Sequence, residues 1–156
     1  MNPDKAIPKA KVILMAEDDL DDRLLAKDAL AECGLGEELY FVDNGEELLD
    51  YLLQRGKFNA QTPQPGLILL DLNMPVKDGR EVLQEIKANA SLRRIPVVVL
   101  TTSRADTDIE QIYLLGANSF ITKPVRYETL VEVMRTIGQY WFKTVELPAA
   151  AITSHA

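Results

Sequence analysis

Four apolar runs in the sequence end in residues that can bind a metal ion or a phosphate. They are followed by Glu17-Asp18, by Asp71, by Thr101 and by Lys123. Carboxylate oxygens are ligands that Mg²⁺ prefers. A lysine ammonium and a threonine hydroxyl can each donate a hydrogen bond to a phosphoryl oxygen. If the fold brings these residues together, they form a site for metal-assisted chemistry on a phosphoryl group.

The position of Asp71 needs an explanation, because this carboxylate directly follows the apolar run "GLILL" at 66–70. A run this dense in apolar residues predicts a strand that is buried on both faces, as in a parallel sheet. A charge removed from water is costly unless it is paired or bound to a cation. Asp71 is therefore either a solvated strand end without a role or part of a site.

Short apolar runs alternate with longer amphipathic stretches along the chain. Strands are expected at 11–17, 38–42, 65–75, 95–101 and 118–122, and helices at 22–33, 44–56, 80–89, 107–116 and 127–143. This alternation predicts an α/β protein with a parallel sheet and helices on both faces. The fold class expected is a flavodoxin-like (βα)5 arrangement, with a doubly wound five-stranded parallel sheet in three α/β/α layers. Function in such folds lies at the carboxyl ends of the strands.

Because the carboxyl ends of parallel strands share one edge, the chemically active residues should gather there. Several carboxylates close together repel one another, and a divalent cation would relieve the repulsion. Taken singly, Asp71 fits a solvated turn, Thr101 fits β-propensity, and Lys123 fits a surface charge. Asp19, Asp21 and Asp22 are attributed to the positive N-terminal end of the first helix. The joint placement at four strand ends favours a site.

These same stretches resemble a known family, the response-regulator receiver domain of two-component signalling. The matching pieces are "VILMAEDD" (12–19), "LILLDLNMPVKDG" (67–79), "VVVLTTS" (97–103) and "SFITKPV" (119–125). They occur in the family's order, and the similarity spans 10–143. The sequence also resembles a narrower group, the single-domain regulators of cyanobacterial phytochromes. That similarity rests on 56–75, on 77–103 and on the ending "WFKTVELP" (141–148).

The resemblance implies a phosphoacceptor and a metal site. Asp71 would be the nucleophile that takes a phosphoryl group from a kinase phosphohistidine. Mg²⁺ would be held by Asp18 directly, by Glu17 through water, by Asp71, and by the backbone carbonyl of Asn73. A carboxylate nucleophile gives an acyl phosphate, which is a recognised covalent intermediate.

The resemblance also implies how the phosphate is held and reported. Lys123 would contact the phosphoryl group, and Thr101 would form a hydrogen bond to it. Phe120 would be the switch aromatic that turns inward when Thr101 moves, which shifts an existing conformational equilibrium. The Lys123–Pro124 peptide bond would be cis, as in the family.

Bulk properties exclude several classes of function. A net charge of −7 and a pI of about 4.8 argue against nonspecific nucleic-acid binding. No apolar run is long enough for a membrane span, and the N-terminus lacks a signal-peptide core, so a cytoplasmic protein is expected. Cys33 is the single cysteine and His155 the single histidine, which argues against disulfides and histidine-dependent catalysis. We expect one domain at 10–145, with flexible termini at 1–9 and 148–156.

The three consecutive aromatic residues Tyr140, Trp141 and Phe142 suggest an interface. Successive helical residues point about 100° apart, so the three cannot all face one core. Trp141 continues the apolar stripe of the last helix. At least one of Tyr140 and Phe142 should therefore be exposed to solvent or covered by a partner. Either the tail at 145–148 folds back over it, or a homodimer forms through the last helix and its extension. The narrower resemblance also implies a dimer, and it implies a phytochrome-type sensor histidine kinase as partner.

The expected function is a phosphoacceptor signalling protein rather than an enzyme, with Mg²⁺-dependent self-phosphorylation and dephosphorylation alone. Two alternatives stay open: a receiver-like scaffold that is never phosphorylated, and an intermediate of a multi-step phosphorelay. A dehalogenase-type phosphatase is disfavoured because it needs a second aspartate where Asn73 stands. A flavodoxin-type binding module is disfavoured because the acidic "EDDLDDR" at 17–23 would repel a phosphate without a metal.

Overall fold

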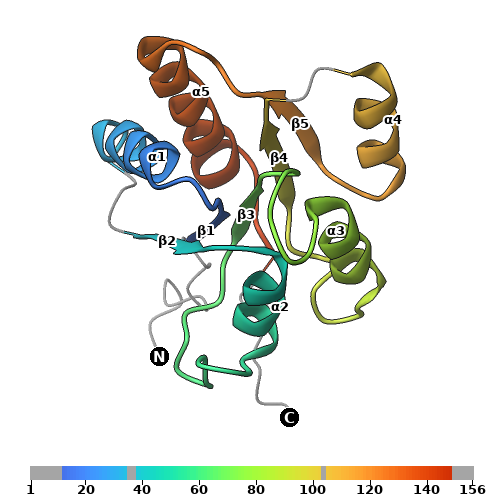
Figure 1. Ribbon diagram of the computed structural model, residues 1–156. Coiled ribbons are helices and arrows are strands. Elements are labelled where there is room, and N and C mark those ends of the chain that lie inside the picture. Colours follow the sequence, from blue (N-terminus) through green and yellow to red (C-terminus); the bar gives the residue numbers. More distant parts are fainter. Residues whose placement is uncertain (1–11, 35–37, 103–104, 149–156) are drawn as a thin grey trace.

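The computed structural model describes residues 12–34, 38–102 and 105–148, which form a parallel sheet between two layers of helices (Figure 1). The strand order is β2-β1-β3-β4-β5, and every pairing is parallel. The strands are β1 (Ile13–Ala16), β2 (Leu39–Val42), β3 (Leu67–Leu70), β4 (Val97–Thr101) and β5 (Ser119–Thr122). The flavodoxin-like, doubly wound fold expected from the sequence is confirmed.

The inner strands are almost entirely apolar because helices cover both faces of the sheet. Every residue of β1, β3 and β4 is buried, whereas the residues of the edge strand β5 are half-buried. The order of the sheet reverses at β1, which pairs with β2 on one side and with β3 on the other. The carboxyl ends of β1 and β3 therefore flank the topological switch point, where ligands bind in open α/β sheets.

Two helices pack on one face of the sheet and three on the other, as Figure 1 shows. The first layer contains α1 (Leu20–Glu32) and α5 (Tyr127–Gln139), and the second contains α2 (Gly45–Leu53), α3 (Gly79–Ala88) and α4 (Asp106–Leu114). Among the described residues, no helix has the length and apolar character that a membrane crossing requires.

Helix α1 differs from the sequence prediction in its start and in its buried face. It begins at Leu20 rather than at 22, because Oδ1 of Asp19 accepts the backbone N–H groups of the first turn. The spacing of Leu25, Ala29 and Cys33 in the sequence puts them on one stripe of this helix, which predicts that they face inward. The buried residues are instead Ala26, Ala29 and Leu30, and Leu25 is 40% exposed. Two alanines on the inner face let α1 lie close to the sheet.

Asn44 with Glu47 three residues later resembles a capping box in the sequence, and helix α2 forms this cap but ends earlier than the predicted 56. Oδ1 of Asn44 accepts the N–H of Glu47 at 2.8 Å, and the Glu47 carboxylate accepts the N–H of Asp43 at 3.0 Å. This is the reciprocal bonding that a capping box provides. The helix ends at Leu53 rather than at Gly56, because Gln54 adopts a left-handed conformation with φ 57°.

The last helix ends earlier than the predicted 143. Helix α5 stops at Gln139 and continues as a π-helical turn over Tyr140–Thr144. The wider turn is closed by the Val145 N–H, which donates to the carbonyl of Tyr140. Leu147 is buried, so the chain returns to the body after this turn. Of the termini expected to be flexible, 1–9 and 148–156, all residues except Pro148 lie outside the described residues.

Candidate functional site

The predicted site residues lie at one edge of the sheet, at the carboxyl ends of four strands. Glu17 follows β1, Asp71 follows β3, Thr101 ends β4 and Lys123 follows β5. The Glu17 N–H donates to the carbonyl of Val42, and the Lys123 N–H donates to the carbonyl of Thr101. These backbone hydrogen bonds extend the sheet by one residue, which fixes the directions in which the side chains leave it.

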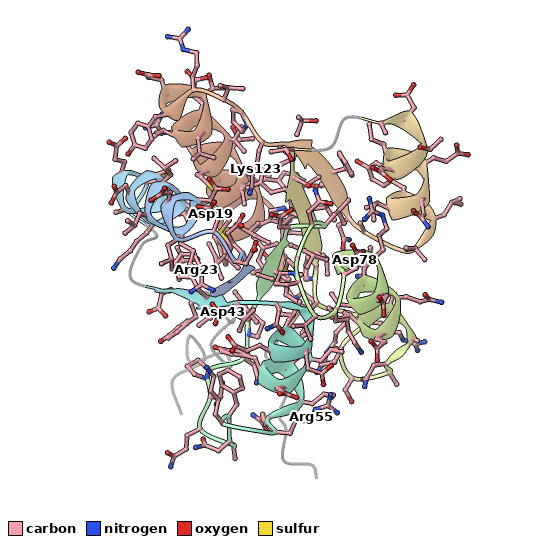
Figure 2. All side chains as sticks on the ribbon, in the orientation of Figure 1. Asp19, Arg23, Asp43, Arg55, Asp78 and Lys123 are labelled. Carbon is pink, nitrogen blue, oxygen red and sulfur yellow. The ribbon has the colours of Figure 1, made fainter. Side chains whose placement is uncertain are left out.

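The ammonium group of Lys123, which Figure 2 labels at this edge, is surrounded by carboxylates. Its Nζ donates to Oε1 of Glu17, to Oδ2 of Asp22 at 2.9 Å and to Oδ2 of Asp71 at 3.4 Å. The Lys123 side chain is 12% exposed. A buried ammonium needs such partners, because a charge without them would be costly to remove from water.

The carboxylate of Asp71 has two chemically different oxygens. Oδ1 accepts the backbone N–H of Asn73 at 3.1 Å and the hydroxyl of Thr101 at 3.1 Å. Oδ2 lies 3.4 Å from Nζ of Lys123. The side-chain amide of Asn73 also donates to the Thr101 hydroxyl oxygen at 3.4 Å. Oδ2 thus accepts fewer hydrogen bonds than Oδ1, and it is the oxygen beside the ammonium of Lys123.

The pKa values of Glu17 and Lys123 are both raised, for different physical reasons. The pKa of Glu17 is raised to about 7, mainly by burial; the Asp71 charge adds to this effect, and Lys123 opposes it. For Lys123, burial favours the neutral form, but hydrogen bonds to Glu17 and Asp22 and the Asp71 charge outweigh it, so its pKa is raised. Burial thus disfavours the charged form of Glu17, whereas surrounding carboxylates favour the charged form of Lys123.

The residues present fit a hard divalent cation. Carboxylate oxygens of Glu17, Asp18 and Asp71 all lie within 4.8 Å of one another. This all-oxygen donor set, together with the excess negative charge, suits Mg²⁺, as the sequence suggested. The backbone carbonyl of Asn73 as a further ligand stays a prediction.

The loop that joins β3 to α3 contains two features that the sequence analysis missed. Gly79 packs directly on the backbone that follows β3: a Cβ at this position would lie 2.6 Å from the carbonyl oxygen of Asp71. The Lys77 N–H donates to the carbonyl of Pro75 at 2.7 Å, across Val76 with φ 68°. This three-residue turn is strained for a β-branched residue. The "PVKDG" stretch is thus a tightly folded loop held against Asp71.

Thr101 and Phe120, the pair expected to form the switch, lie on the same face of the sheet. Neighbouring strands pair Val99 with Phe120 and Thr101 with Thr122. Paired residues point to the same face, and residues two apart share it. Phe120 is half-buried against the core on the side of α2, α3 and α4. The inward rotation of Phe120 stays a prediction.

Two further residues contact the site, and the sequence analysis missed both roles. Asp22, attributed to the positive end of α1, contacts Lys123, whereas Asp19 is the residue that caps the helix. Arg23, which Figure 2 labels, donates from Nε to the carbonyl of Glu17 at 2.6 Å and pairs with Asp43. Their spacing after Glu17, one turn into the helix, is the signal that could have indicated these contacts.

One implied feature is corrected by the structure. The described part of the chain contains no cis peptide bond, so the Lys123–Pro124 bond is trans rather than cis. The trans isomer of a bond before proline is favoured by about 0.5–1 kcal/mol. Nζ of Lys123 reaches all three carboxylates with the bond in this form.

Comparisons with known proteins agree with this geometry. The response regulator receiver domain family matches residues 13–135. Response regulator Rcp1 of Synechocystis sp. is 44% identical over 140 residues, which cover 90% of this chain and 95% of that protein.

Two solved structures are similar throughout. The phosphorylated cyanobacterial phytochrome response regulator RcpA has a TM-score of 0.84 at 42% identity, and the Mn²⁺-bound form of Rcp1 has a TM-score of 0.80 at 42% identity. Each comparison covers 91% of this chain and all of the other. The chain therefore belongs to the response regulator receiver domain family.

Proposed function

We propose that Asp71 accepts a phosphoryl group from the phosphohistidine of a sensor histidine kinase, in a Mg²⁺-dependent reaction. The observation that carries this proposal is the environment of one carboxylate. Asp71 lies between the hydroxyl of Thr101 and the ammonium of Lys123, and its oxygens lie beside those of Glu17 and Asp18. Phosphoryl transfer requires positioned donors and neutralised charge more than covalent chemistry, and this arrangement supplies both.

In the proposed reaction, Oδ2 of Asp71 attacks phosphorus in line with the nitrogen of the phosphohistidine. The O–P bond forms, the N–P bond breaks, and the electron pair of that bond returns to the imidazole nitrogen. Oδ1 is held in place by the Asn73 N–H and the Thr101 hydroxyl, which leaves Oδ2, beside Lys123, as the oxygen that reacts. Lys123 donates to an equatorial phosphoryl oxygen. Glu17, Asp18 and Asp71 would hold Mg²⁺, and the ion would supply positive charge that offsets the charge of the transferred group.

The signal in this proposal is a change in the hydrogen bonding of Thr101. Its hydroxyl, which donates to Asp71 in the described structure, would donate to a phosphoryl oxygen after transfer. Phe120, on the same face of β5, would turn inward into the space that Thr101 leaves. The phosphorylated protein thus favours a second arrangement of the α4–β5 side, which another protein reads.

The kinase partner is supported by exposed apolar side chains on α1 and in the turn after Lys123, two segments that flank the site. On α1, Leu20 and Leu24 are 69% and 60% exposed, and Val125 after Pro124 is 93% exposed. Exposed apolar side chains on segments that flank a reactive site are available for protein binding. We propose that the kinase docks here. The similarity to phytochrome response regulators supports a phytochrome-type kinase, and the proposal places the domain at 10–145 in the cytoplasm.

The homodimer also belongs to the proposal. A groove of about 400 Å³ runs between α5 and the edge strand β5, and Ile121, Val133, Ile137, Tyr140 and Trp141 line part of it. Tyr140 is 49% exposed although Leu147 of the following segment is buried, so the returning chain leaves Tyr140 open. A second copy of α5 and its extension would cover this apolar surface.

The chemistry of the modified protein separates this function from the scaffold alternative. Protein incubated with a ³²P-labelled, autophosphorylated histidine kinase should gain label that hydroxylamine removes, because hydroxylamine cleaves acyl phosphates. Label that passes on to a histidine phosphotransfer domain would favour the phosphorelay intermediate instead. A protein that stays unlabelled by kinase and by acetyl phosphate alike would favour the scaffold.

A further inference from the structure

The three carboxylates that contact Lys123 differ in exposure and in their place relative to the metal site. The side chain of Glu17 is 1% exposed and that of Asp71 is 10% exposed, whereas that of Asp22 is 40% exposed. Glu17 and Asp71 belong to the group of carboxylates that can hold a cation, and Asp22 does not. Asp22 therefore binds the same ammonium from outside the metal cluster, at the mouth of the site.

This arrangement creates a competition in the structure without metal. Lys123 occupies oxygens of Glu17 and Asp71, which are two of the three carboxylates available to a divalent cation. A cation that binds there takes up part of their charge and repels the ammonium. The ammonium of Lys123 then needs another negatively charged partner, because its side chain is buried.

We propose that Asp22 is a positioning residue that retains the ammonium of Lys123 when a divalent cation occupies the carboxylates of Glu17, Asp18 and Asp71. This inference rests on the metal site of the proposed function. Asp22 is suited to the task because its Oδ2 is already 2.9 Å from Nζ. Its backbone is fixed by the N–H bond to Oδ1 of Asp19 in the first turn of α1.

Asp22 thereby lowers the cost of metal binding. With Asp22 in place, Lys123 shifts its hydrogen bonding toward α1 and keeps a charged partner. Without the Asp22 carboxylate, Lys123 either competes with the divalent cation for Glu17 and Asp71, or remains buried with less of its positive charge neutralised. Both outcomes weaken the binding of the cation, and both act through Lys123.

Mg²⁺ titration of four proteins tests this, with Kd measured by calorimetry at constant ionic strength. Asp22→Asn should raise the Mg²⁺ Kd about tenfold, the range expected for a lost hydrogen bond to a charged group. Asp21→Asn is the matched control, because it removes the same charge from the same turn. The exposed side chain of Asp21 is not among the described carboxylates that contact Lys123. It should change Kd less than about threefold, and Asp22→Glu should recover part of the parent affinity.

A double-mutant cycle decides whether the effect passes through Lys123. In a Lys123→Met background, Asp22→Asn should weaken Mg²⁺ binding no more than Asp21→Asn does. Equal effects of the two aspartate changes in the parent would overturn the proposal. A full Asp22→Asn effect in the Lys123→Met background would also overturn it, because Asp22 would then act on the cation directly. A parent that binds no Mg²⁺ would instead refute the metal site of the proposed function itself.

A crystal structure of the Mg²⁺-bound parent gives an independent readout. Nζ of Lys123 should lie within hydrogen-bonding distance of Asp22 and should no longer contact Oδ2 of Asp71. A structure in which Nζ leaves Asp22 and keeps Asp71 would contradict the proposal.

Discussion

The hydroxyl of Thr101 lies 3.1 Å from Oδ1 of Asp71, across the ends of two neighbouring strands. Both residues are buried, and the hydroxyl is the donor. This hydrogen bond joins Asp71, the proposed phosphoacceptor, to β4. The pairing of β4 with β5 then connects β4 to Phe120. The hydrogen bond between Thr101 and Asp71 is thus the first contact that a phosphoryl group on Asp71 would change.

Thr101→Ala should separate phosphorylation from its structural consequence. The variant keeps Asp71 and Lys123, so it should still be phosphorylated by acetyl phosphate. The backbone amide signals of β5, Phe120 included, should shift by less than half as much as in the parent when NMR spectra are compared before and after phosphorylation. Thr101→Ser retains the hydroxyl and should shift normally. Parent-like shifts in Thr101→Ala would show that the signal does not pass through this hydroxyl.

The raised pKa of Glu17 predicts how stability depends on pH without metal. Its pKa is raised from 4.5 to about 7 in the folded protein, mainly by burial. Between these values the folded state binds the proton more tightly than the unfolded state does, so the free energy of unfolding should fall as pH rises. The loss is on the order of 1–3 kcal/mol and is complete above about pH 7.

Urea denaturation of metal-free protein between pH 4.5 and 8 measures this effect. Glu17→Gln should flatten the slope, whereas Glu110→Gln, an exposed acid on α4, should leave it as in the parent. Mg²⁺ at pH 7.5 should stabilise the parent more than Glu17→Gln, since it binds the ionised carboxylate. A slope that persists in Glu17→Gln would assign the pH dependence to other groups.

Leu24→Glu should impair phosphorylation by the kinase and spare phosphorylation by a small molecule. A charge in the middle of the exposed apolar surface of α1 should slow transfer from an autophosphorylated phytochrome-type kinase by about tenfold or more, as for a central interface residue. Leu114→Glu, at an 80% exposed position on α4, is the matched control. The rate with acetyl phosphate should stay close to that of the parent. Equal slowing with both donors would point to damage at the site rather than at a docking surface.

Tyr140→Ala should dissociate the proposed homodimer. In sedimentation velocity at micromolar concentration, the parent should run at twice the chain mass, and the variant should run as a monomer. Phe142→Ala should weaken the dimer less, because Phe142 is half-buried against the chain's own core. Tyr40→Ala, on the opposite edge strand, tests for nonspecific effects. A monomeric parent would remove the dimer from the account.

The placement of Asp71, Thr101 and Lys123 together could be predicted from sequence because it follows from topology. Alternating strands and helices imply a parallel sheet, and a parallel sheet brings the carboxyl ends of its strands to one edge. The prediction needed no side-chain detail, and the coarse fold and the gathered site followed from it.

The details that failed depend on packing that sequence periodicity does not contain. Leu25 was expected to be buried, but α1 turns its alanines inward because small side chains permit close approach to the sheet. The π-helical turn after Gln139 comes from a local change in hydrogen bonding within an unbroken apolar pattern. Asp22 had an adequate explanation in the helix dipole, so its spacing after Glu17 was not taken as a sign of the contact with Lys123 that the coordinates show.

Phosphorylation should occur on Asp71 and should require Mg²⁺. The intact mass of the parent and of Asp71→Asn, measured after incubation with acetyl phosphate with and without Mg²⁺, shows whether it does. The parent should gain one phosphoryl group only when Mg²⁺ is present, and the variant should gain none. The same gain in Asp71→Asn, or a gain in the parent without Mg²⁺, would contradict this expectation.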